Sequence, residues 1–296
     1  MGQSILLDGH VFRNGKRAPI RMRPSEAYLG RTLDGEHPYW PEAAAGLPQI
    51  SWLSSGYDII LKTGATRTSR KRADGTMSRG PRKFLMLLGA ACTPRLVKTD
   101  RKDWGRPARV AQLKALGAEY APFDYVSPDL DRVLSAMDRL PRKERKDRSA
   151  ALLKCLNRYW PAYAGTLKVP AYHLAIKHVY DRGEVASEWF GRLSEVAWVA
   201  VGTGALRVPG EAVVKTSQTQ TIYASEDFIA GVTADDLRSG LASELKIITD
   251  VRASDLVAVI EGARVSVDGV DALRVLGAYR SLAKLCPNPV DRKSVV

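Results

Sequence analysis

Residues 195–214 read EVAWVAVGTGALRVPGEAVV, and this stretch decides the fold that we predict. β-Branched and aromatic residues lie on both sides of Gly202-Thr203-Gly204, a combination typical of two short strands joined by a turn. Pro209-Gly210-Glu211-Ala212 follows the second strand. We therefore predict a β-hairpin followed directly by a Pro-x-Glu-Ala segment.

The same order of parts occurs near the N-terminus. Residues 5–7 and 20–23 are the expected strands, Asp8-Gly9 and Asn14-Gly15 are turn signals between them, and Pro24-Ser25-Glu26-Ala27 follows. Two copies of strand, turn, strand and Pro-x-Glu-Ala indicate a scaffold built by repetition. The predicted fold class is α+β, with two small strand-turn-strand sheet units joined and flanked by helical segments.

Helical patterns fill the rest of the chain. Ser127-Pro128 is a good helix start, since Ser can cap a helix and Pro suits its first position. Pro161 is expected to close the next helix, and the charged run 141–148 is read as a solvated linker or helix start rather than an anion site. Further helices are expected around Leu85, Trp189, Leu237, Leu256 and Leu276. The expected regions are a first hairpin unit with a basic loop at 1–126, a helical connector at 127–180, and a second hairpin unit with C-terminal helices at 181–290.

Composition places the chain among ordinary globular proteins. The 296 residues are 45% hydrophobic and 26% charged. There is no apolar run of the roughly 18 residues that a membrane span needs, and no signal peptide at the N-terminus. The three cysteines, Cys92, Cys155 and Cys286, fit reduced thiols. These features predict a cytoplasmic protein without a membrane partner.

Positive charge is concentrated in one stretch. The net charge is +13, and residues 62–109 hold fourteen Lys or Arg against three Asp, a net charge of +11. A localised basic patch attracts polyanions, and aromatic side chains among the cations can stack on bases. A nucleic-acid-binding module is therefore one interpretation. Its candidate polyanion contacts are Arg67, Arg70, Lys71, Arg72, Arg79, Arg101, Lys102, Trp104 and Arg106.

The sequence carries no recognisable site for catalysis. It has no P-loop, no G-x-G-x-x-G and no G-x-S-x-G motif. His173 and His178 are five apart, which on a helix would place them on different faces and disfavour a shared metal ion. We therefore predict no catalytic, cofactor-binding or metal-binding residues, no cofactor and no enzyme activity on this chain.

Three segments resemble one family. Residues 82–97, RKFLMLLGAACTPRLV, resemble the FL-x-LLGA-x-TAPRL segment of the large NO VEIN and sacsin-like proteins, which carry a GHKL-type ATPase domain at their N-terminus. Residues 23–29, RPSEAYL, resemble the preceding RPSEAYLP element of bacterial members. Residues 198–214 resemble the later TPWVPT-x-G-x-L-x-RPSDVFLP element, with Val208-Pro209-Gly210-Glu211 in place of Arg-Pro-Ser-Asp. The segments occur in the same order and span nearly the whole chain.

The resemblance implies a middle region of a larger protein. The D-x-G-x-G turn of the family's nucleotide site is absent, so no ATP-site residue carries over to this chain. The expected function is a structural and coupling segment with a chaperone-like or bacterial defence role, whose partners are other domains of the same protein. Residues 291–296, DRKSVV, match the translation of a sequencing adapter and are expected to be an artefact, with a natural polar tail as the alternative.

Overall fold

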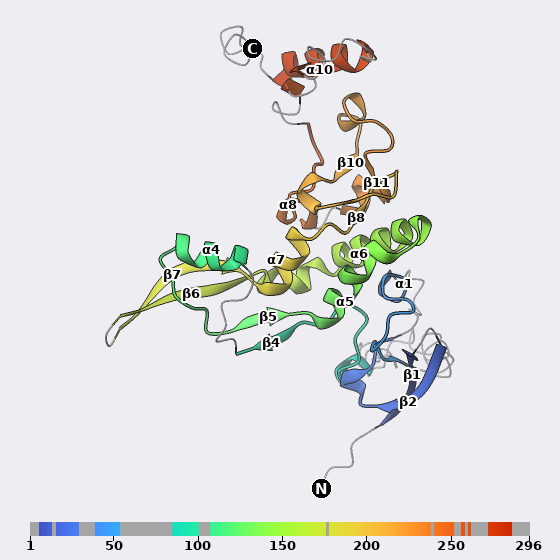
Figure 1. Ribbon diagram of the computed structural model, residues 1–296, viewed down its shortest axis with the longest axis vertical. Coiled ribbons are helices and arrows are strands. Elements are labelled where there is room, and N and C mark those ends of the chain that lie inside the picture. Colours follow the sequence, from blue (N-terminus) through green and yellow to red (C-terminus); the bar gives the residue numbers. More distant parts are fainter. Residues whose placement is uncertain are drawn as a thin grey trace, which may run out of the picture. The chain divides into compact units, whose positions relative to one another are not determined.

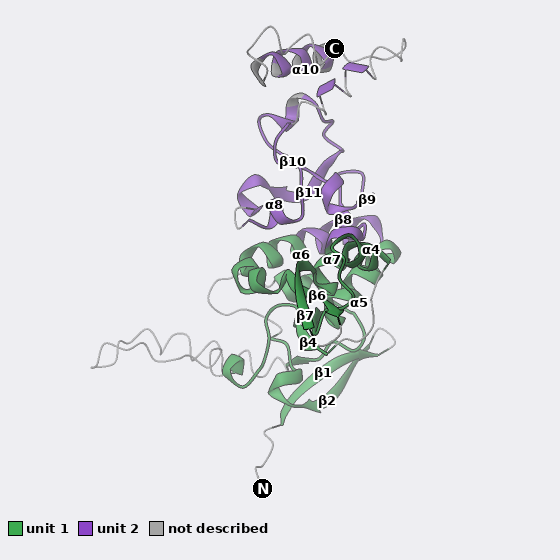
Figure 2. Ribbon diagram, turned by 90° about the vertical axis from the view of Figure 1, so that its left-hand side faces the viewer, with its two compact units in different colours: residues 1–140, 151–193 green, residues 141–150, 194–296 purple. Residues whose placement is uncertain are grey.

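The chain divides into two compact units. In the computed structural model, unit 1 comprises Met1–Leu140 and Ala151–Leu193, and unit 2 comprises Pro141–Ala150 and Ser194–Val296 (Figure 2). The residues that the structure describes are 6–13, 16–29, 39–53, 85–100, 107–175, 178–237, 240–251, 256–257, 260–261 and 272–285.

Unit 1 contains a three-stranded antiparallel sheet of order β2-β1-β3 (Figure 1). Its strands are β1 (Leu7–Arg13), β2 (Lys16–Met22) and β3 (Trp52–Leu53). Alternate side chains of β1 are buried, as expected of a strand with one face on a core. That core includes Leu7, Met22, Leu29, Leu53 and Leu85. The turn η1 (Pro24–Glu26) and helix α1 (Tyr39–Ala43) belong to the same part of the chain.

The rest of unit 1 combines helices with two further strand pairs. The pairs are β4 (Val97–Thr99) with β5 (Asp124–Val126), and β6 (Lys168–Ala175) with β7 (His178–Ala186). The helices are α4 (Pro107–Ala115), α5 (Pro128–Ala136), η2 (Met137–Arg139), η3 (Ala164–Thr166) and α7 (Glu188–Glu195), whose last two residues belong to unit 2. Helix α6 (Arg142–Tyr163) contributes its first nine residues to unit 2 and the others to unit 1.

Unit 2 is built from short elements. Its antiparallel pair is β8 (Val199–Ala200) with β9 (Leu206–Arg207), and its parallel pair is β10 (Val213–Lys215) with β11 (Phe228–Thr233). Its helical elements, besides the start of α6, are η4 (Pro209–Glu211), η5 (Thr219–Thr221), η6 (Ala234–Leu237), α8 (Leu241–Glu244) and α10 (Ala272–Leu285). Two side chains of α6 hold the β8–β9 hairpin: Ser149 Oγ accepts the Ala200 N–H at 2.9 Å, and Arg145 donates to the Gly204 carbonyl at 3.0 Å.

The α+β class of small strand pairs with helices is confirmed. The predicted start of α5 is also confirmed, since Ser127 Oγ accepts the N–H of Leu130 and Pro128 is the first helical residue. Helix α6 begins at Arg142, so residues 142–148 are a helix start, one of the two predictions for this charged run. The prediction that Pro161 closes this helix is wrong, because the helix continues to Tyr163.

Candidate functional site

The first Pro-x-Glu-Ala segment forms a turn in which Pro24 and Ala27 are buried and Ser25 and Glu26 are exposed. The Ala27 N–H donates to the Pro24 carbonyl at 3.1 Å, and the Glu26 carboxylate accepts the Arg23 N–H at 3.0 Å. The following Ala27, Tyr28 and Leu29 are at most 2% exposed. The apolar half of the motif in unit 1 is therefore packed inside the protein, whereas its polar residues are exposed.

This turn is joined to the second family-like segment. A helical turn at residues 85–87 ends at Gly89, whose φ is +102°, and Ala90 donates to the Leu85 carbonyl at 2.9 Å. Ala91 then donates to the Ala27 carbonyl at 3.0 Å and accepts from the Leu29 N–H at 2.9 Å. The turn at residues 24–27 and the segment at residues 85–91 thus meet in a two-bond parallel bridge.

Unit 2 repeats this bridge. Ile248 donates to the Ala212 carbonyl and accepts from the Val214 N–H, both at 2.9 Å. The residue in place of Gly89 is Lys246, whose φ of +57° is also positive, and it follows helix α8 as Gly89 follows the turn at 85–87. The same backbone hydrogen bonds therefore recur with different side chains.

The strands also correspond in register. In unit 1, Met22 pairs with Leu7 and Tyr28 forms a parallel bridge with Trp52. In unit 2, Arg207 pairs with Val199 and Val213 forms a parallel pair with Phe228. We call the shared arrangement the repeat core. It comprises residues 7–9, 20–29, 52–53 and 85–91 in unit 1, and residues 199–201, 205–214, 228–229 and 242–248 in unit 2.

Tyr28 lies at the centre of a polar cluster in unit 1. Its hydroxyl donates to the Asp129 carboxylate at 2.5 Å and accepts the Arg95 N–H at 3.2 Å. The Arg95 guanidinium lies 4.2 Å from the ring centroid and donates to the Ala27 carbonyl, and Asp129 also binds Arg132 at 2.6 Å. Burial, and then the neighbouring Asp129, raise the pKa of Tyr28 well above its ordinary value. The phenol therefore stays neutral and ties three segments together.

Two cysteines lie buried in the same unit. Cys92 and Cys155 are free thiols, and burial raises the pKa of Cys155 well above its ordinary value. A nucleophilic cysteine needs a lowered pKa and some exposure, so Cys155 is suited to packing rather than to catalysis. Nearby, the Tyr163 hydroxyl donates to the Pro94 carbonyl at 2.9 Å.

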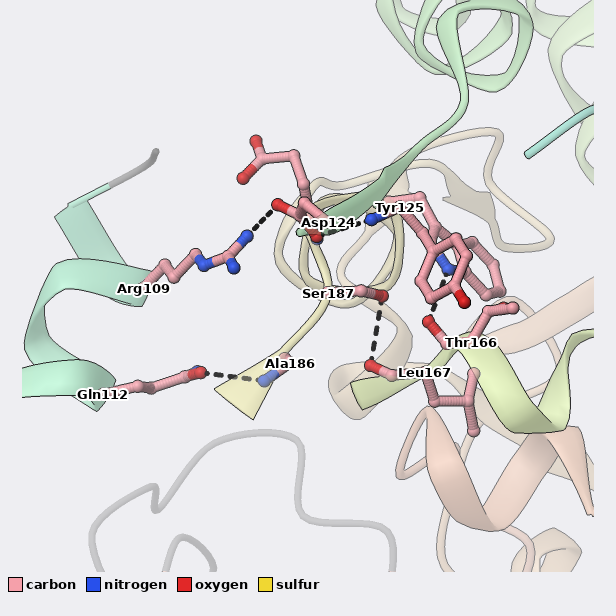
Figure 3. A network of polar contacts seen from close by, with 10 residues as sticks. Arg109, Gln112, Asp124, Tyr125, Thr166, Leu167, Ala186 and Ser187 are labelled. Carbon is pink, nitrogen blue, oxygen red and sulfur yellow. Dashed lines mark hydrogen bonds and ion pairs between the residues drawn. The ribbon is translucent and has the colours of Figure 1, made fainter. Parts of the chain in front are cut away.

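A second buried polar network joins α4, β5 and α7 (Figure 3). Arg109 and Asp124 form an ion pair in which their side chains are 4% and 0% exposed. The other Asp124 oxygen accepts hydrogen bonds from the N–H groups of Tyr125 at 2.7 Å and Glu188 at 3.0 Å. It therefore satisfies a backbone N–H group at the start of helix α7. Next to it, Ser187 Oγ donates to the Leu167 carbonyl at 3.1 Å. The network is consistent with a structural role, because the charges satisfy one another.

The structure tests only part of the basic stretch 62–109. The nine candidate polyanion contacts, from Arg67 to Arg106, lie outside the described residues. Three other cations of this stretch have internal partners: Arg95 at Tyr28, Lys98 with its Nζ 3.9 Å from the Phe123 ring centroid, and Arg109 at Asp124. Of these three, Arg109 is buried, Arg95 is half-buried and Lys98 is exposed. The sequence could not show these contacts, because the partners come from other elements.

The described parts of the chain hold two of the histidines weighed as metal ligands, His173 and His178. Within these parts, no group of three or more His, Cys, Asp or Glu side chains is placed to hold a metal ion. His173 and His178 lie on paired strands and not on a helix, so the helical spacing argument does not apply to them. His173 Nδ1 lies 3.2 Å from a Glu119 carboxylate oxygen.

Comparison of the chain with protein-family models, with curated proteins and with solved structures finds no match. Among the helices that the structure describes, none has both the length and the apolar character required to cross a membrane.

Proposed function

We propose that this chain is a non-catalytic structural segment that couples other parts of a larger sacsin or NO VEIN-like protein with a GHKL-type ATPase domain. The observation that carries the proposal is the way in which the Pro-x-Glu-Ala segments are hydrogen-bonded. In both copies, Pro-x-Glu-Ala and the residues after it are bound through backbone hydrogen bonds to a distant helix end. Segments used in this way build a rigid scaffold.

The buried polar residues support the same function. Tyr28, Asp129 and Arg95 satisfy one another, as do Arg109 and Asp124. Polar networks that are fully satisfied in a core rigidify it and specify one arrangement. A segment that transmits movement between other domains needs this property. A cytoplasmic location and a chaperone-like or bacterial defence role belong to the proposal, the location resting on the free thiols of Cys92 and Cys155.

The proposal is tested with the purified chain and with its source DNA. We expect no phosphate release from ATP and Mg²⁺, and no rise of the melting temperature with ATP concentration. Binding to the folded state would raise that temperature by mass action, so a dose-dependent rise would contradict the proposal, as would turnover. Long-read sequencing of the locus is expected to show a GHKL-type ATPase reading into Met1.

The alternative function, a basic nucleic-acid-binding module, stays a prediction for its nine candidate residues. Neutralising Arg70, Lys71 and Arg72 together tests it. Each lost phosphate contact lowers the log-log salt slope of binding by about 0.7 to 0.9. An unchanged slope would reject these residues as contacts.

A further inference from the structure

The two copies of the repeat core differ in the length of their first hairpin. In unit 2, Gly202-Thr203-Gly204 closes the hairpin directly after the shared strand pairs. In unit 1, β1 and β2 continue through four more pairs, from His10 with Pro19 to Arg13 with Lys16 (Figure 1). We call these four pairs the hairpin extension. Unit 2 forms the repeat core without them, so the extension is not required by the core.

The hairpin of unit 1 is rich in exposed cations. All five of its basic side chains are exposed: Arg13, Lys16, Arg17, Arg21 and Arg23. The acidic residues among the described residues 6–29 are Asp8 and Glu26, and Asp8 lies 3.4 Å from Arg21.

The repeat core does not require these charges. Arg13, Lys16 and Arg17 have no counterpart in unit 2. Leu206 occupies the place of Arg21, and Val208 that of Arg23. Arg13 and Lys16 are directly opposite each other, and like charges so placed destabilise a strand pair. Charge that opposes folding and is dispensable to the core indicates an external, negatively charged partner.

Aromatic side chains share one face with two of these cations, Arg17 and Arg21, whereas Arg13 and Lys16 form a pair of the other face at the end of the hairpin. The cross-strand pairs Asp8 with Arg21, His10 with Pro19, and Phe12 with Arg17 lie on the same face, because side chains alternate along a strand. His10 and Phe12 are half-buried, and their ring centroids are 5.8 Å apart at an interplanar angle of 78°. Their partly exposed rings leave an aromatic surface between Arg17 and Arg21.

We propose that the hairpin extension, together with Arg21, binds single-stranded nucleic acid. Arg17 and Arg21 contact phosphates on the face where Phe12 stacks on a base, and Arg13 and Lys16, the last pair of the hairpin, contact phosphates at its end. Proteins that bind single strands without sequence preference combine a basic surface with aromatic side chains in this way. A membrane surface would use the cations but would not need the aromatic ring among them. This surface does not depend on the proposed coupling function.

The test measures binding of the full chain to a fluorescent oligothymidylate by anisotropy over a range of salt concentrations. The variant is R13Q/K16Q/R17Q. The matched control is K143Q/R207Q/K215Q, which removes three exposed cations of unit 2 and leaves the same net charge. We expect the variant to lower the log-log salt slope by about 2, from about 0.7 for each phosphate contact, with a smaller change for the control. F12A is expected to weaken binding by about fivefold or more.

Several results would overturn the proposal. One is an unchanged slope for the triple variant, and another is an equal loss for the control, which would reflect net charge alone. Binding that F12A leaves unchanged would remove the stacking contact. The triple variant is also compared with the unchanged chain for binding to phosphatidylserine vesicles. If the variant loses vesicle binding but keeps oligothymidylate binding, the hairpin extension is a membrane surface instead. Circular dichroism spectra and melting curves that match those of the unchanged chain establish that each variant is folded. If the triple variant does not fold, the single variant R17Q is used in its place.

Discussion

Gly89 offers the sharpest test of the repeat core. Its φ of +102° is unfavourable for a residue with a Cβ, and a Cβ added there would lie 3.1 Å from both Cα and Cβ of Ser25. The backbone conformation alone costs roughly 1 to 2 kcal/mol, partly offset by the lower entropy of the unfolded alanine chain. The Ser25 contact requires the Pro-x-Glu-Ala turn to shift. We therefore expect Gly89→Ala to destabilise unit 1 by about 2 kcal/mol.

Gly183 provides the matched control. Its φ is +101°, and nothing lies within 4 Å of an added Cβ. Gly183→Ala therefore measures the cost of the conformation without the contact, about 1 kcal/mol. Urea unfolding followed by circular dichroism gives both values, provided that the slopes with denaturant agree. Equal effects of the two variants would refute the role assigned to the Ser25 contact.

Lys246 allows the reciprocal experiment in unit 2. It occupies the position of Gly89 with a φ of +57°, a conformation that favours glycine. Lys246→Gly should stabilise unit 2 by about 0.5 kcal/mol, since relief of the left-handed conformation exceeds the added entropy of the unfolded chain. A destabilised variant would mean that the Lys246 side chain makes a contribution that the repeat core does not explain.

Three further predictions follow from the titratable groups. The pKa of Tyr28 is raised, so the stability that it contributes is full below about pH 10 and is lost as the pH rises further; Tyr28→Phe should flatten this alkaline loss in urea unfolding. Asp124→Asn leaves Arg109 buried without its carboxylate and should cost about 3 to 5 kcal/mol, whereas Asp8→Asn, at an exposed ion pair, should cost under about 1 kcal/mol. Burial, and then a nearby arginine, lower the pKa of His10, so its NMR titration midpoint should lie below about 6.5 and stability should fall as the pH drops through it.

Local signals predicted the elements whose stability is local. Helix α5 has a capping Ser127, a Pro at its first position and an apolar stripe that includes Leu130, Val133 and Leu134, and all are found where expected. By contrast, the β6–β7 hairpin was not predicted. Its second strand exposes its first seven residues, and a strand without a buried face shows no hydrophobic alternation.

Tertiary packing overrode one local signal. Pro161 lacks an N–H and ordinarily ends or kinks a helix, yet α6 continues past it. Trp160 and Tyr163 are 3% and 5% exposed, and the Tyr163 ring lies 5.3 Å from that of Trp189. Burial of large aromatic side chains stabilises the last residues of the helix by more than the lost hydrogen bond destabilises them.

The sequence and the tertiary structure also decide different properties of the basic residues. The sequence identified the charge-rich stretch 62–109, but whether a cation is exposed depends on what packs against it. Arg109 is buried because Asp124 on β5 pairs with it, whereas Arg13 and Lys16 remain exposed on a hairpin that lies outside the charge-rich stretch. Net charge is a property of the sequence, and the position of charge on a surface is a property of the fold.

The sequence misplaced the first strand, because Asp8-Gly9, predicted as a turn after residues 5–7, lies within β1. By itself, it determined the α+β class and the Pro-x-Glu-Ala segment that follows a strand pair in each unit. These depend on turn residues, strand propensity and short-range hydrogen bonds, all of which are encoded by neighbouring residues. Only the tertiary structure decided that Ala27 bonds to Ala91 and Ala212 to Ile248. Backbone groups are the same at every residue, so the partner of such a bridge is chosen by packing between distant segments and not by a local pattern.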